Sequence, residues 1–290
     1  MGENSKIEWT HHSWNPWEGC TKVGPGCDHC YAEARDIRFT GGAHWGPHAP
    51  RRSTSAANWN KPPKWNRAAA KAGRRFRVFC ASLADVFDNH PSITDDMRRE
   101  LGALILATPH LDWMLLTKRI GNALRYLAIM FPNGTPANLW IGATIVNQAE
   151  ADRDIPKLLE VPATVRFLSM EPLLGPVDLT AIRCGMWTSN ALTGLDSQDV
   201  PVTLDTIRLV ICGGESGPKA RPMHPDWARS LRDQCVAAGV AFHFKQWGEW
   251  GAGGHRVGKA SSGRHLDGRT WDQMPGEAVP CLNAFRFLAP

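Results

Sequence analysis

Three cysteines lie close together near the start of the chain, in the segment CTKVGPGCDHC that runs from Cys20 through Cys27 to Cys30. Their spacing is C-x6-C-x2-C, and the Gly-Pro-Gly run lets the loop turn tightly enough for all three sulfurs to converge. On a [4Fe–4S] cluster, three thiolates leave one coordination position free for an exogenous ligand. With zinc, a fourth protein ligand would close a structural site, and the nearby candidates are His11, His12 and His29. The spacing by itself leaves both metals open.

The elements that must position this loop are predicted from alternating apolar and helical patterns. Short apolar runs predict buried strands at residues 77–82, 111–116, 139–144, 165–169, 207–212 and 240–245, with a further strand at 7–9. Helical patterns predict helices over 94–107, 120–130, 147–160 and 225–238. This alternation predicts an α/β fold with parallel strands, as a full or partial (β/α) barrel, with an open doubly wound sheet as the alternative.

Polar residues follow several of these strands, where the site of a parallel α/β protein lies. Lys118, Arg119 and Lys245 are suited to binding a carboxylate or a phosphate, with solvation at the surface as the alternative for Arg119. Glu171, after Ser169, is suited to a hydrogen bond with a ribose or a substrate, or to a salt bridge with Arg166 or Lys118. In the run Gly213-Gly214-Glu215-Ser216, the glycines permit close backbone approach to a ligand, and the acid can grip an ammonium or a ribose hydroxyl.

Five segments together carry a resemblance to a known family, namely WNPWEGC at 14–20, LTKR at 116–119, FLSMEPLLG at 167–175, GGESG at 213–217 and FKQWGEW at 244–250. They resemble the phage-associated three-Cys-motif family, which is regarded as similar to radical SAM enzymes. The usual radical SAM spacing is C-x3-C-x2-C with an aromatic residue before the last cysteine. Here the first interval is longer, and His29 stands at the aromatic position.

The resemblance implies a radical-SAM-like barrel and an enzyme that reductively cleaves S-adenosylmethionine (SAM). Cys20, Cys27 and Cys30 would bind a [4Fe–4S] cluster. Cofactor contacts would come from His29, Ser169, Glu171, Gly213, Gly214, Glu215 and Ser216, and catalytic roles would fall to Lys118, Cys212 and Lys245, with Cys212 as a hydrogen-atom donor. A reductase of flavodoxin or ferredoxin type is an expected partner protein. The alternative is a zinc-stabilised nucleic-acid-binding protein of phage type without redox chemistry.

The charge distribution favours a nucleic acid or nucleotide as substrate. The net charge is +5, yet no acidic residue lies between Asp36 and Asp85, and ten basic residues do. Three tryptophans in the same stretch, Trp45, Trp59 and Trp65, offer surfaces for stacking on bases. We expect residues 38–75 to form a basic loop or insertion, with Arg51, Arg52, Lys61 and Lys64 on phosphates.

Composition places the chain among globular proteins. The 290 residues are 43% hydrophobic and 21% charged, which excludes disordered and fibrous classes. No apolar run reaches the ~20 residues of a membrane span, and the first residues lack the pattern of a signal peptide. We therefore expect a single cytoplasmic domain over residues 1–290 without a membrane partner, in which the eight cysteines are free thiols or metal ligands.

Overall fold

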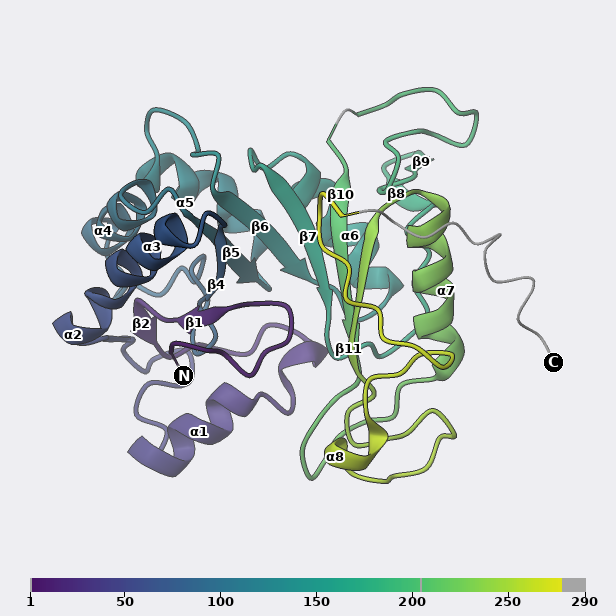
Figure 1. Ribbon diagram of the computed structural model, residues 1–290, viewed down its shortest axis with the longest axis horizontal. Helices are drawn as coiled ribbons and strands as arrows, with labels where there is room; N and C mark the ends of the chain where they lie inside the picture. The colour runs from purple at the N-terminus through teal and green to yellow at the C-terminus, as the bar shows by residue number, and fades with distance from the viewer. Residues whose placement is uncertain (1, 204, 278–290) are drawn as a thin grey trace. The chain divides into compact units, whose positions relative to one another are not determined.

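A computed structural model describes residues 2–203 and 205–277 (Figure 1). The chain divides into two compact units. The first unit comprises residues 1–143 and 161–164, and the second unit comprises residues 144–160 and 165–290. The single domain expected from the sequence stays a prediction.

The first unit contains a parallel sheet with the order β1-β4-β5-β6. Its strands are β1 (His12–Trp14), β4 (Phe76–Cys80), β5 (Leu111–Thr117) and β6 (Leu139–Thr144). The register pairs Trp14 with Cys80, Cys80 with Leu115 and Leu115 with Ile141, and all four side chains are buried. The apolar runs thus form a core layer because both faces of these strands are covered.

Helices and short elements connect these strands. They are the antiparallel pair β2 (Trp17–Glu18) and β3 (Arg52–Ser53), α1 (Tyr31–Thr40), α2 (Ala56–Trp59), α3 (Lys61–Lys71), α4 (Asp95–Leu106) and α5 (Ala123–Met130), with 3-10 turns at Pro25–Cys27 and Ile120–Asn122. The helix α4 begins at Thr94, whose hydroxyl accepts the backbone N–H of Met97. It packs closely on α5, since a Cβ at Gly102 would lie 2.3 Å from the carbonyl oxygen of Met130.

The second unit has its own parallel strands, with β10 (Ile207–Gly213) between β7 (Val165–Met170) and β11 (Ala241–Gln246). The helix α7 (Pro225–Ala237) contacts β10 and β11, and starts with Pro225, which has the backbone φ of a first helical turn. The remaining elements are α6 (Gln148–Leu159), α8 (Lys259–Ser262) and the hairpin of β8 (Ile182–Cys184) and β9 (Trp187–Ser189), which contacts α6.

The predicted α/β class with parallel strands is confirmed. Six predicted strands and four predicted helices are found within one or two residues of their expected bounds, although the helix expected at 120–130 starts with a 3-10 turn. Within each unit the strand order follows the chain order, which agrees with a partial barrel; a doubly wound sheet reverses its order at a switch point. No helix in the described part of the chain is long and apolar enough to cross a bilayer.

Two expectations about local structure were wrong. Residues 7–9 form no strand, because the backbone turns there, with the N–H of Thr10 bonded to the carbonyl of Ile7; the first strand is β1 instead. The basic stretch 38–75 is not one long loop, since α2 and α3 occupy much of it. Its prolines start α3 rather than break it, and the helix is held by a buried face of Pro62, Trp65 and Ala69.

Candidate functional site

The three-cysteine loop of the first unit leads from β2 into α1. Cys27 ends the 3-10 turn and is buried, whereas Cys20 and Cys30 are half-buried, with Cys30 at the N-cap of α1. Among the residues that the structure describes, no group of three or more His, Cys, Asp or Glu side chains is arranged to hold a metal ion. The residue types suit a metal, although the described side chains are not arranged as a metal site.

A buried arginine lies against the first cysteine of this loop. Arg119 donates from Nη1 to Sγ of Cys20 at 3.4 Å and from Nη2 to the carbonyl oxygen of Thr21 at 2.7 Å. Its guanidinium also lies 3.4 Å from a carboxylate oxygen of Asp85 and 3.6 Å from one of Asp88. Only 9% of the arginine side chain is exposed. The loop is therefore held at Cys20 by the desolvated Arg119 guanidinium, whose charge is balanced by the carboxylates of Asp85 and Asp88.

Strand ends position this arginine. Asp85 follows β4 and accepts hydrogen bonds from the Thr117 hydroxyl at 2.8 Å and from the backbone N–H of Lys118 at 3.0 Å, at the end of β5. Asp88 accepts from Nε of Arg51 at 2.8 Å, and Arg51 in turn donates to the Thr21 hydroxyl. Two carboxylates and two guanidiniums thus form one buried network beside the loop, which we call the Arg119 network (Arg51, Asp85, Asp88 and Arg119).

The network sets the protonation of Cys20. Burial, together with the carboxylate of Asp85, raises the pKa of the Cys20 thiol to about 11, although the Arg119 guanidinium acts to lower it. Without a metal, Cys20 is therefore a neutral thiol at pH 7. A metal ion replaces that proton when it binds, so metal binding at this cysteine releases a proton.

In the second unit, several predicted residues meet at the ends of β7, β10 and β11. Glu171 forms a salt bridge with Lys245 at 2.5 Å, and Ser169 donates to Glu171 at 3.5 Å. A Cβ at Gly213 would lie 3.4 Å from the Glu171 side chain. The partner of Glu171 is thus Lys245, whereas the sequence suggested Arg166 or Lys118. Arg166 pairs with Asp205 instead.

The Gly-Gly-Glu turn is shaped by packing within the second unit. A Cβ at Gly214 would lie 1.9 Å from the carbonyl oxygen of Trp247, so this glycine is required by a close backbone approach. Glu215 is buried and accepts three hydrogen bonds from Arg221, two of them from the guanidinium. Ser216 accepts from the Gln246 amide at 2.9 Å. The Glu215 carboxylate, which was expected to bind an ammonium or a ribose hydroxyl, is therefore already paired with the Arg221 guanidinium.

Three further predicted residues lie near these two groups. Cys212 lies fully buried within β10, and burial, with the nearby Glu171, raises the pKa of its thiol well above the usual value. His29 is half-buried beside Cys30 in the loop. Lys118 is half-buried, and its ammonium forms no ion pair within the part of the chain that the structure describes.

The aromatic and basic residues of 38–75 are used differently from what the sequence suggested. Trp65 is buried and stacks on His12 with ring centroids 4.2 Å apart, and Trp59 meets Trp14 edge to face. Arg51 belongs to the buried network rather than to a phosphate surface, and Arg52 pairs with Glu18. Base stacking by Trp65 and phosphate contact by Arg51 are therefore excluded in this fold.

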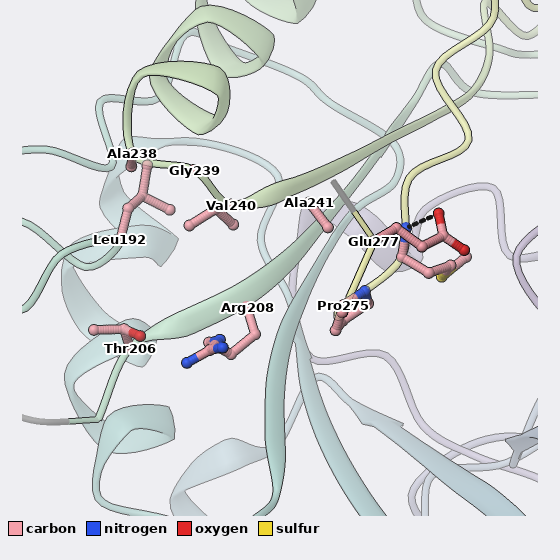
Figure 2. A pocket seen from close by; sticks show the side chains of 11 residues that line it. Leu192, Thr206, Arg208, Ala238, Gly239, Val240, Ala241, Pro275 and Glu277 are labelled. Atoms are coloured by element: carbon pink, nitrogen blue, oxygen red, sulfur yellow. Dashed lines mark hydrogen bonds between the residues drawn. The ribbon is translucent and has the colours of Figure 1, made fainter. Parts of the chain in front are cut away.

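A pocket of about 260 Å³ lies in the second unit, at the start of β10 and β11 (Figure 2). Thr206 and Arg208 line it beside β10, while Val240 and Ala241 line it beside β11. None of the residues predicted as catalytic or ligand-binding lines this pocket. Because sites of parallel α/β proteins lie at the opposite, carboxyl ends of the strands, the pocket is not the expected site.

The sequence did not indicate that Arg119 is the central member of the first group. Arg119 was considered for binding a carboxylate or a phosphate, with surface solvation as the alternative, Arg51 was expected on phosphates, and Asp88 was given no role. One local signal existed, since Asp85 and Asp88 follow one strand and Arg119 follows the next strand along the chain. Parallel strands bring such residues to the same edge of the sheet.

Comparison with known proteins identifies a family whose description names no function. The profile of a family described as "Protein of unknown function (DUF5131)" matches residues 4–275. No curated protein matches the chain. No solved structure matches it either. Because the profile covers most of the chain, the protein belongs to that family.

Proposed function

We propose that this member of the DUF5131 family is an iron–sulfur enzyme of radical SAM type that acts on a nucleic acid or nucleotide. Cys20, Cys27 and Cys30 would hold a [4Fe–4S] cluster, with SAM as the second cofactor. The cluster and SAM together would supply a carbon-centred radical that abstracts hydrogen from the substrate. Everything else in the reaction depends on how this chain binds and orients those groups.

The observation that carries the proposal is the hydrogen bond from buried Arg119 to Cys20 Sγ. Taking four charged side chains out of water is expensive, and replacing such networks by apolar residues often leaves stability unchanged or higher. Stability alone therefore gives little reason to keep the Arg119 network beside a cysteine. Hydrogen bonds and positive charge at a ligand sulfur do affect a metal centre, because they set its reduction potential and favour the thiolate.

Within this proposal, the Arg119 network has two tasks. Arg119 holds Sγ of Cys20 and the Thr21 carbonyl, so the first sulfur is oriented before the loop closes on a metal. Asp85 and Asp88 keep the guanidinium in that place and partly balance its charge. The remaining two sulfurs lie on the 3-10 turn and at the N-cap of α1, and metal binding would be coupled to the conformation of this part of the loop.

The second unit supplies a polar group of a different kind. Lys245 and Glu171 form a short ion pair that retains some exposure, 20% and 13% of the two side chains. The free hydrogen-bonding positions of such a pair suit the hydroxyls and the charged groups of a nucleotide. We propose that Lys245, Glu171 and Ser169 contact cofactor or substrate, whereas Glu215 supports the fold through Arg221.

Two of the three histidines considered as a fourth ligand for zinc are engaged elsewhere. His12 stacks on Trp65, with its Nδ1 accepting the backbone N–H of Asn4. His11 accepts the backbone N–H of Arg77 through Nδ1 and stacks on Phe76. Both rings are thus engaged at the β1 edge of the sheet. A closed Cys3His site with either histidine would require those contacts to be given up.

The test is to purify the protein without oxygen and determine iron, acid-labile sulfide and zinc. The proposal expects four iron and four sulfide per chain, from the composition of the cluster, and release of 5′-deoxyadenosine when SAM and dithionite are added. Stoichiometric zinc in a colourless protein would contradict it. An iron-containing protein that never cleaves SAM would retain the cluster and reject the radical chemistry.

A further inference from the structure

The helix α3 presents a row of cations that the structure leaves unpaired. Within residues 2–203 and 205–277, no carboxylate forms an ion pair with any of the four cations Lys61, Lys64, Arg67 and Lys71. Lys64, Arg67 and Lys71 are exposed, and Lys61 is half-buried. Their spacing of three or four residues places them along one side of the helix. We call this row the α3 basic face.

The opposite side of α3 is anchored in the first unit. Pro62, Trp65 and Ala69 are buried, and the helix contacts β4 and β5 (Figure 1). Asn66 adds a hydrogen bond, since its side-chain oxygen accepts the backbone N–H of His110 at 2.8 Å. The cations therefore project from a helix whose orientation is fixed by its buried side.

Helix stability does not account for this arrangement. The positive end of a helix dipole favours acids in the first turn, yet α3 has none there and carries Lys61 and Lys64 instead. Like charges three and four residues apart also repel one another. By contrast, the exposed Arg99 on α4 pairs with Asp96 at 2.6 Å. An anionic partner would relieve the repulsion on α3.

We infer that the α3 basic face binds the sugar–phosphate backbone of a nucleic acid. Lys61 and Lys71 are ten residues apart, so the four cations extend over about 15 Å along the helix axis. One strand of B-DNA carries a phosphate every ~3.4 Å of its axis, so α3 spans about four phosphates with its four cations. Because Trp65 is buried and stacks on His12, it provides no stacking platform here. Recognition at α3 therefore uses phosphates and is insensitive to base sequence.

This inference rests on the nucleic-acid substrate of the proposed function. Of the contact residues that the sequence suggested, it keeps Lys61 and Lys64 and replaces Arg51 and Arg52. Arg51 and Arg52 are each held by an acid, whereas Arg67 and Lys71, which lie further along the chain, are free. The phosphate-binding surface thus belongs to α3 rather than to the segment before it.

The experiment replaces Lys61, Lys64, Arg67 and Lys71 together by Gln, and measures affinity for a fluorescein-labelled DNA duplex and for one of its strands. With four phosphates contacted, wild-type duplex binding has a log–log salt slope of about −3 to −4, or roughly 100-fold loss between ~50 and ~200 mM salt. The α3 variant is expected to bind at least about tenfold more weakly at ~50 mM salt, with a slope near −1 or shallower.

A matched control removes the same charge elsewhere. Arg183, Arg208, Lys219 and Lys259 are exposed residues of the second unit that form no ion pair in the described part of the chain. Their replacement by Gln should leave duplex affinity within about threefold of wild type. Far-ultraviolet circular dichroism checks that both variants remain folded.

Three results would overturn the inference. The first is equal loss of affinity in both variants, which would reduce the effect to net charge. The second is wild-type binding that does not depend on salt. The third is binding to vesicles containing phosphatidylserine without binding to DNA or RNA. Iron content separates this test from the proposed function: a colourless protein that binds DNA through α3 refutes only the cluster, and an iron-loaded protein insensitive to the α3 change refutes only this surface.

Discussion

The two units of the molecule both carry charged groups at the ends of parallel strands, but they use them differently. In the first unit, the Arg119 network is buried and its arginine donates to the sulfur of a cysteine. In the second unit, Arg221 satisfies Glu215, and Gly214 is required by the Trp247 carbonyl. The second arrangement is explained by the fold alone. The Arg119 network is not explained by the fold alone, and for this reason we propose that the metal chemistry belongs to the first unit.

The largest expected effect is the loss of the buried cation. Arg119→Met leaves Asp85 and Asp88 with one cation fewer in a desolvated place, and removing one partner of a buried pair costs about 3–5 kcal/mol. Arg221→Met leaves Glu215 without its guanidinium, but 29% of the Arg221 side chain is exposed, so about 1–3 kcal/mol is expected. Urea unfolding measures both changes in the free energy of unfolding.

Arg99→Met is the control for that comparison. Its partner Asp96 is almost fully exposed, so the loss of this pair should cost no more than about 0.5 kcal/mol. If Arg119→Met proved no more costly than Arg99→Met, the Arg119 network would not be the buried structure described above.

The next prediction compares the cost of replacing Gly213 and Gly214 in the Gly-Gly-Glu turn of the second unit. Gly214→Ala drives a methyl group into the Trp247 carbonyl and should destabilise the protein by about 1–3 kcal/mol or more. Gly213→Ala meets its nearest atoms at 3.4 Å and should cost less than about 1 kcal/mol. Thermal unfolding of the two variants decides this. Equal costs would mean that the turn is not shaped by the Trp247 contact.

The smallest effect concerns acid stability of the first unit. Burial, aided by the charges of Arg77 and Arg74, lowers the pKa of His11 from 6.5 to about 4. Between those values the unfolded chain binds a proton and the folded chain does not, so stability falls as the pH drops from 6.5 to 4 and then levels off. Allowing for solvent screening, the loss is about 1–2 kcal/mol.

His11→Asn tests this, because the amide oxygen can accept the Arg77 N–H without titrating. The free energy of unfolding of this variant should vary less with pH than that of wild type between pH 6.5 and 4. An unchanged slope in His11→Asn would contradict the assignment.

Local sequence patterns were sufficient for most of the fold. The run Ile207–Gly213 is apolar and bounded by polar residues, and Thr94 stands where an N-cap is needed, so β10 and α4 could be predicted. The helix α3 was not predicted, because the stretch 38–75 was interpreted as a basic loop or insertion, and only the burial of Trp65 shows which face is anchored. Proline in the first turn is compatible with a helix start.

The site was less predictable because its key contacts join distant parts of the chain. The bond between Arg119 and Cys20 spans 99 residues, and the pair of Glu171 and Lys245 spans 74. Residue types at the strand ends indicated which side chains were available, but not which of them pair. For the Gly-Gly-Glu turn, the sequence predicted a ligand-binding role that the structure does not require. The Trp247 carbonyl explains the need for Gly214, and Arg221 pairs with Glu215.

The most direct test of the central claim is the iron content of two cysteine variants that differ only in the place of the lost thiol. Cys27 lies buried in the three-cysteine loop, and Cys235 lies fully buried in α7. After anaerobic purification, Cys27→Ala should contain essentially no iron or labile sulfide, and Cys235→Ala should match wild type. Full iron in Cys27→Ala, or equal loss in both variants, would contradict a cluster held by this loop.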